Sequence, residues 1–153
     1  MRLRTYLAIA LLAFLVATIG AETFAGLAIG ANSPTEALRR LSEWEPVELV
    51  GMAYMFTPFL AISLICAKTG EITSGHQARA IFAVAMLALT GLYAVGYWGA
   101  QEAMNEEKWT AAALGVGFLP VIFGAPVMLF SLLAAMLAVK FDRTVRSEGR
   151  HES

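Results

Sequence analysis

Cysteine, histidine and charge are scarce in this chain. Its 153 residues include one Cys and two His, and only 15% are charged, against about 25% in a typical soluble domain. The single Cys66 excludes an internal disulfide, and neither His76 nor His151 has the spacing of a metal-ligand set. A net charge of -1 without a strongly basic tail argues against nucleic-acid binding. We therefore expect no metal, no cofactor and no nucleic-acid partner.

Long polar segments are also missing, because four apolar runs dominate the chain. Hydrophobic residues make up 58% of the sequence, and the runs cover residues 5–31, 47–67, 80–100 and 111–139. Each is about 20 residues or longer, enough for a helix to cross a hydrocarbon core of about 30 Å. The sequence therefore predicts one all-α integral membrane domain, residues 1–153, built as a four-transmembrane-helix bundle with a tail at 140–153.

Basic residues are sorted onto alternate connections between the runs. Most of the 11 Lys and Arg residues lie at the N-terminus, between runs two and three, or in the tail: Arg2, Arg4, Lys68, Arg79, Lys140, Arg143, Arg146 and Arg150. The other two connections carry Arg39, Arg40 and Lys108 and are rich in Glu. Because basic loops near membrane ends stay in the cytoplasm, we expect a multi-pass inner-membrane protein with both termini cytoplasmic.

The start of the chain permits a second interpretation, a cleaved signal peptide. A signal core is about 7–15 residues long, which is shorter than the first run. Ile19 also fits poorly at the third position before a cleavage site after Ala21. We expect the first span to be retained; its removal would leave three spans.

The first connection has the pattern of a short surface helix. Ser33 and Glu36 form a capping box around Pro34, which suits a first helical position. The apolar residues that follow recur at helical spacing: Ala37, Leu38, Leu41 and Trp44. This pattern predicts an amphipathic helix on the outer surface that ends before Pro46, with a partner-docking helix as the alternative.

Small residues and prolines mark where the helices should pack and bend. The expected helix-packing residues are Ala13, Ala17, Ala21, Ala25, Gly26, Gly30 and Gly91. Such residues let backbones approach closely in lipid, within the chain or across a dimer seam. Pro58, Pro120 and Pro126 cannot donate a backbone hydrogen bond, so we expect kinks there. Broken helices also build substrate sites in transporters, which is the functional alternative.

Glu22 is the acid that interrupts an apolar run. Counted from Thr5, it lies roughly 25 Å along the first helix, about 5 Å short of the outer boundary. Tyr54, Tyr93 and Tyr97 fall at similar depth, so a hydroxyl cluster around Glu22 is geometrically feasible. The carboxylate is either solvated or hydrogen-bonded, a site for a proton, cation or ligand, or paired with a basic residue. These four residues are the ligand or ion candidates, and we predict no catalytic residue.

The layout resembles, in topology only, the small membrane subunit of tripartite substrate-binding-protein-dependent transporters. The shared features are four spans, a helix after the first, prolines in the fourth, and an acid-and-Trp cluster before the second, formed by Trp44, Glu45 and Glu48. The resemblance implies a subunit of a transport complex.

The residues themselves favour a protein that acts by helix–helix contact. The sequence has one candidate acid within an apolar run, no set of metal ligands and many small residues. These features fit an accessory subunit, an assembly factor or an immunity-type protein. The alternative is a small oligomeric transporter or channel in which Glu22 is the coupling carboxylate. A lipid- or quinone-binding enzyme would need an apolar groove lined by Tyr54, Tyr93 and Tyr97. The expected partners are the lipid bilayer and either another membrane protein or further copies of this chain.

Overall fold

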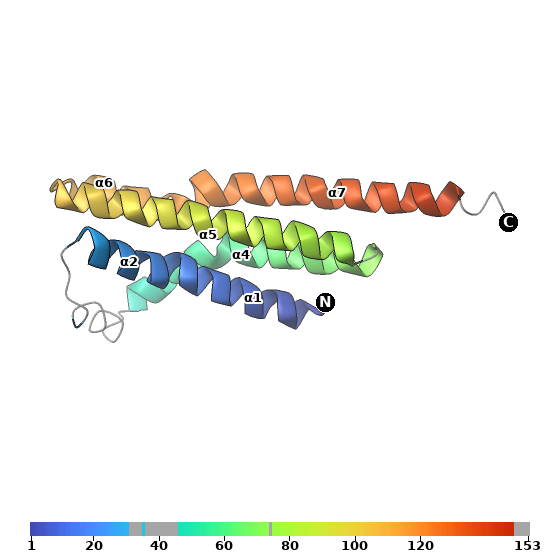
Figure 1. Cartoon of the computed structure of the whole chain (residues 1–153), viewed down its shortest axis with the longest axis horizontal. Coiled ribbons are helices and arrows are strands. Elements are labelled where there is room, and N and C mark those ends of the chain that lie inside the picture. Colours follow the sequence, from blue (N-terminus) through green and yellow to red (C-terminus); the bar gives the residue numbers. More distant parts are fainter. Residues whose placement is uncertain (31–34, 36–45, 74, 149–153) are drawn as a thin grey trace.

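The computed structural model describes residues 1–30, 35, 46–73 and 75–148, and these contain helices and no strand. The first rod joins α1 (Leu3–Leu15), the π-helical turn η1 (Val16–Gly20) and α2 (Ala21–Ala28). The second and third rods are α4 (Pro46–Ile72) and α5 (His76–Asn105). The fourth consists of α6 (Trp109–Gly117), the π-helical turn η2 (Pro120–Gly124) and α7 (Ala125–Glu148) (Figure 1). The surface helix expected at residues 33–45 lies outside the described residues.

Four segments are long and apolar enough to cross a membrane: Leu3–Ala28, Leu49–Ile72, His76–Asn105 and Trp109–Asp142. Their outward side chains are strongly hydrophobic, with Leu87 exposed by 75% and Phe130 by 71%. In water such a surface would aggregate, whereas in lipid it is the normal exterior of a helix. By length and composition, the chain is therefore a multi-pass membrane protein.

The helices do not end where the apolar runs end. Residues 68–79, which lie between the second and third apolar runs, are mostly helical, because α4 continues to Ile72 and α5 begins at His76. Lys68 and Glu71 form an ion pair at 2.8 Å within this extension, a spacing that supports a helix. Gly75 completes the turn with φ of 71°, a left-handed conformation that glycine adopts without strain. The first rod is shorter than its run, since α2 ends at Ala28.

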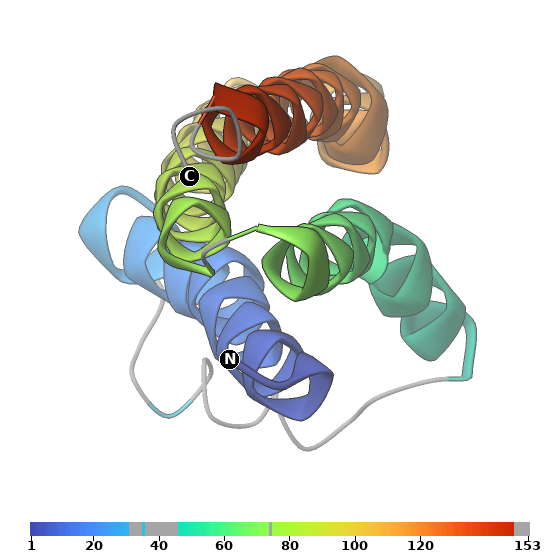
Figure 2. The same cartoon turned by 90° about the vertical axis from the view of Figure 1, so that its right-hand side faces the viewer.

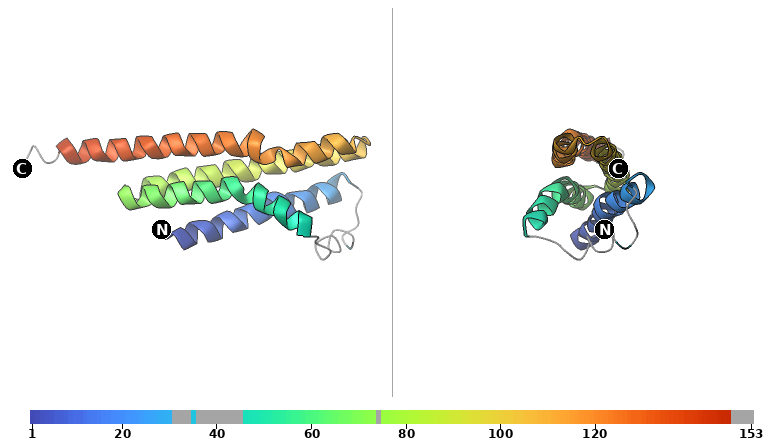
Figure 3. Two further views of the ribbon diagram at one scale, coloured as in Figure 1. Left: turned by 180° about the vertical axis from the view of Figure 1, so that it is seen from behind. Right: turned by 90° about the vertical axis from the view of Figure 1, so that its left-hand side faces the viewer.

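α5 is the central helix of the bundle. It packs against the first, second and fourth rods, while α4 packs on α1 on one side and on α7 on the other (Figure 2). Its buried residues form a stripe at helical spacing: Ala78, Phe82, Ala85, Met86, Leu89 and Tyr93. α1 begins, α4 ends and α7 ends on the same side of the bundle (Figures 1 and 3).

We call this side the basic end, after Arg2, Arg4, Lys68, Arg79 and Lys140. The opposite side is the acidic end, after Glu102 near the end of α5 and Glu106 and Glu107 in the turn that joins α5 to α6.

Aromatic side chains fill the interior between the rods. Phe59 of α4 contacts Phe14 and Tyr93, with ring centroids 5.5 and 5.4 Å apart. Tyr6 and Phe82 form a similar pair at 4.8 Å nearer the basic end. The buried hydroxyls of Thr18, Ser63 and Ser131 each donate to the carbonyl four residues earlier in their own helix. Over the part of the chain described, most of the buried side chains are apolar.

Candidate functional site at the acidic end

The bend of α4 at Pro58 is held by the two rods beside it. Pro58 leaves the Tyr54 carbonyl without its usual helical donor, and the next carbonyl, of Met55, accepts a hydrogen bond from the Tyr93 hydroxyl at 3.1 Å. On the other side the Pro58 ring lies against Gly124, where an added Cβ would collide with it. The bend is visible in the middle of α4 (Figure 3). It therefore packs directly against η2.

The fourth rod is interrupted where the sequence places its prolines. α6 ends at Gly117, Pro120 opens η2, and Pro126 is the second residue of α7. Pro120 and Gly124 are buried, so protein covers this irregular backbone. The Leu119 side chain occupies the space where Gly96 of α5 lacks one. The interruption is thus a close-packed joint between α4, α5 and the fourth rod.

Tyr93 and Tyr97 of α5 converge on Met55. The Tyr97 hydroxyl lies 3.6 Å from the Met55 sulfur, in hydrogen-bonding geometry. The structure therefore brings two of the four candidate residues, Tyr93 and Tyr97, together at Met55. Met55, which joins two of them, was not among the candidates chosen from the sequence.

The four candidates differ in their exposure. Tyr93 is fully buried and Tyr97 is half-buried, whereas Glu22 and Tyr54 lie on the outside of the bundle. An open groove lined by all three tyrosines is thus not formed by the residues described, because the ring of Tyr93 is enclosed.

A shallow apolar hollow lies between α2 and α5 on the outside of the bundle. It has a volume of about 240 Å³ and is lined by Ala21 and Phe24 of α2 and by Ala94, Val95 and Trp98 of α5. The rings of Phe24 and Trp98 lie 6.2 Å apart, and the Trp98 indole donates to Glu102 at 2.9 Å. The hollow is therefore an apolar surface formed jointly by α2 and α5.

The small-residue stripe of the first rod faces into the bundle. Ala17, Ala25 and Gly26 are buried, and Ala13 and Ala21 are half-buried. A Cβ on Gly30 would lie 2.6 Å from the Gln101 side chain of α5. Gly91 behaves differently, since it is exposed and a Cβ there would meet nothing within 4 Å. The stripe therefore serves packing within the chain, and Gly91 takes no part in it.

Two amides of α5 hold the end of the first rod and were not predicted as site residues. Asn105 donates to the carbonyl of Ile29 at 2.8 Å, and Gln101 donates to Asn105 at 3.3 Å. Ile29 follows the last residue of α2, where helical carbonyls lack partners. The available signal was the pair of amides four residues apart at the end of an apolar run.

An ion pair closes the turn between α5 and α6. The Lys108 ammonium lies 2.6 Å from a Glu106 carboxylate oxygen. This hydrogen bond, together with the charge of Lys108, lowers the pKa of Glu106 below its ordinary value. Both side chains are exposed, so the pair shapes the turn more than it stabilises the fold.

No protein-family model, curated protein or solved structure matches this chain. Among the residues described, no three His, Cys, Asp or Glu side chains come together as a metal site. Any function must therefore be inferred from the geometry of the bundle itself.

Proposed function

We propose that this protein acts in a membrane by helix–helix contact, as an accessory subunit, an assembly factor or an immunity-type protein. Its place would be the inner membrane, with the basic end in the cytoplasm, because basic connections are retained on that side. The partner would be another membrane protein or further copies of this chain.

The position of Glu22 is the observation that carries this proposal. Phe14, Phe59 and Tyr93 pack together in the interior, while Glu22 is exposed on α2, the helix that lines the hollow with Ala21 and Phe24. Ionisable side chains within spanning helices usually face protein or a water-filled cavity rather than lipid. A surface that joins an apolar hollow with a carboxylate therefore fits a protein partner better than lipid alone.

A photo-cross-linking experiment tests the contact. A photoreactive residue replaces Val95, which lines the hollow and is 66% exposed. The matched control is Leu87 on the same helix, 75% exposed but outside the hollow. In native membranes we expect a defined cross-linked product from position 95 only, and we expect Glu22→Gln to reduce it several-fold. Equal products from both positions, or a product unaffected by Glu22→Gln, would contradict the proposal.

A second candidate is a small oligomeric transporter or channel with Glu22 as its coupling group. An exposed carboxylate on a spanning helix, where ionisable residues often mark ion pathways, favours it. Because Phe14, Phe59 and Tyr93 pack together in the interior, the path would run between copies. Proton or cation flux into vesicles that contain the purified chain separates the two functions. Flux that is lost in Glu22→Gln while assembly persists would support transport and exclude a purely contact role.

A further inference from the structure

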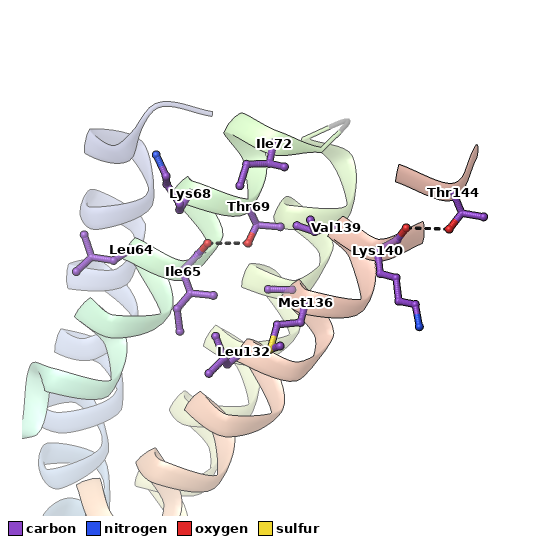
Figure 4. A pocket seen from close by; sticks show the side chains of 11 residues that line it. Leu64, Ile65, Lys68, Thr69, Ile72, Leu132, Met136, Val139, Lys140 and Thr144 are labelled. Carbon is purple, nitrogen blue, oxygen red and sulfur yellow. Dashed lines mark hydrogen bonds between the residues drawn. The ribbon is translucent and has the colours of Figure 1, made fainter. Parts of the chain in front are cut away.

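A second feature lies at the basic end, far from Glu22. It is an open groove of about 700 Å³ between α4 and α7. Its walls are aliphatic, with Leu64, Ile65 and Ile72 from α4 and Leu132, Met136 and Val139 from α7. Figure 4 shows these side chains lining the space between the two helices.

The end of the groove nearest the helix termini is polar and positively charged. Lys68 of α4 and Lys140 of α7 line it, together with Thr69 and Thr144. Thr69 and Thr144 donate to carbonyls of their own helices, at 2.8 and 3.2 Å. The remaining donors are the ammonium groups of Lys140 and of Lys68, and Lys68 also donates to Glu71. In Figure 4 the two ammonium groups point away from each other, so both flexible stems have to turn toward the groove to hold one anion.

The groove matches one leaflet of a bilayer in length and direction. Leu132 and Lys140 are separated by about 12 Å along α7 at about 1.5 Å per residue. Half of a hydrocarbon core is about 15 Å. The groove therefore runs parallel to the helices, from near the middle of the membrane to the end of the spans at Ile72 and Asp142.

We propose that this groove binds one phospholipid with an anionic head group. Its acyl chains lie along the aliphatic walls, and its phosphate is held by Lys68 and Lys140. A neutral lipid would gain nothing from the two lysines, and a second copy of this chain would bring like charges against them. A free phosphate ion would leave the apolar walls uncovered. Only an anionic lipid matches both the charge and the hydrocarbon surface.

Glu71 gives the proposal a specific expectation. It pairs with Lys68 at 2.8 Å, so it competes with a lipid phosphate for that ammonium. The pair is exposed and therefore weak. Removal of the carboxylate by Glu71→Gln should strengthen anionic-lipid binding, which a merely structural role for Lys68 would not produce.

Native mass spectrometry of the full chain in mild detergent tests the site. Phosphatidylglycerol and phosphatidylcholine with identical acyl chains are titrated onto the wild type and its variants. We expect tighter binding of phosphatidylglycerol, and Lys68→Gln and Lys140→Gln should each weaken it about fivefold, with phosphatidylcholine unaffected. The control Arg79→Gln changes a basic residue at the same end that does not line the groove, and it should have no effect.

A groove-filling variant tests the apolar part independently. Met136→Trp fills the groove from a position already 61% exposed, and it should weaken both lipids. Leu137→Trp, on the same helix and 56% exposed but outside the groove, should not. Equal affinity for the two lipids, insensitivity to both lysine changes, or unchanged binding in Met136→Trp would each overturn the proposal.

Discussion

Tyr93 ties α5 to the bend of α4. Its hydroxyl is buried and bonds to the Met55 carbonyl at 3.1 Å. We expect Tyr93→Phe to lower the free energy of unfolding by about 0.6–2 kcal/mol, the range for hydrogen bonds between membrane helices. Thermal unfolding in detergent measures this. The control Tyr54→Phe, at an exposed tyrosine, should change little, and equal losses in the two variants would contradict the role of Tyr93.

Gly124 and Gly91 form a matched pair of helical glycines. A Cβ at Gly124 would collide with the Pro58 ring, whereas a Cβ at Gly91 would meet nothing within 4 Å. We expect Gly124→Ala to destabilise the bundle by about 1–3 kcal/mol through overpacking. Gly91→Ala should be neutral or stabilising by up to about 1 kcal/mol. The same unfolding measurement compares them, and a reversed order would refute close packing between α4 and η2.

Glu106 gives a prediction about pH. Its pKa is lowered in the folded chain because Lys108 donates to the carboxylate and carries the opposite charge. The pair therefore contributes to the stability of the folded chain at any pH above 4.5, the pKa of Glu106 in the unfolded chain. This contribution is lost as the pH falls through the lower pKa of Glu106 in the folded chain. In Lys108→Gln the pKa of Glu106 should rise toward 4.5 in a carboxyl-carbon NMR titration. Lys68→Gln, at the opposite end, should leave it unchanged, and a titration indifferent to Lys108 would refute the pair.

At the scale of elements, the end of α2 depends on a helix far away in sequence. The Asn105 side chain donates a hydrogen bond to the Ile29 carbonyl, and Gln101 donates to Asn105 and so orients it. We expect Asn105→Ala to fray the last turn of α2 and cost about 0.5–1.5 kcal/mol, since water can replace the lost donor. Hydrogen–deuterium exchange of the amides of Ile29 and Gly30 should accelerate. In the control Gln77→Ala, at the other end of α5, these amides should keep their rates.

Helix positions could be predicted from the sequence, but helix rotations could not. Hydropathy is a local property, so the four apolar runs locate four long helices. Each proline likewise indicates where its own helix bends or is interrupted. Which face of α5 meets α4 depends on packing over all rods, and so the link from Tyr93 to Met55 was not predictable. The π-helical turn at Val16–Gly20 contains no proline that would have indicated it. The ends of α4 and α5 near the basic end could not be predicted from hydropathy. Both helices continue past the hydrocarbon through polar residues such as Lys68, where the apolar runs have already ended.

At the scale of the whole molecule, α1 belongs to the core. Tyr6, Ala10, Phe14 and Ala17 are all buried against α4 and α5. Cleavage after Ala21, the second interpretation of the start of the chain, would remove these side chains and expose Phe59 and Phe82. Such a loss would amount to several large-to-small core substitutions at once, each worth about 3–5 kcal/mol for an aromatic residue. The bundle is therefore expected to keep its first span.

The topology of the bundle gives the last prediction. α1 begins and α7 ends at the basic end, which also holds the α4–α5 turn. Reporters inserted before Leu3, at the turn near Gly75 and after Ser153 should all be cytoplasmic, whereas one inserted at Glu107 should be exported. Because three spans with a cleaved start would still leave Gly75 and Ser153 inside, the decisive position is the first. Loss of that reporter from the membrane-bound chain would show cleavage, and an exported reporter after Ser153 would reverse the assigned orientation.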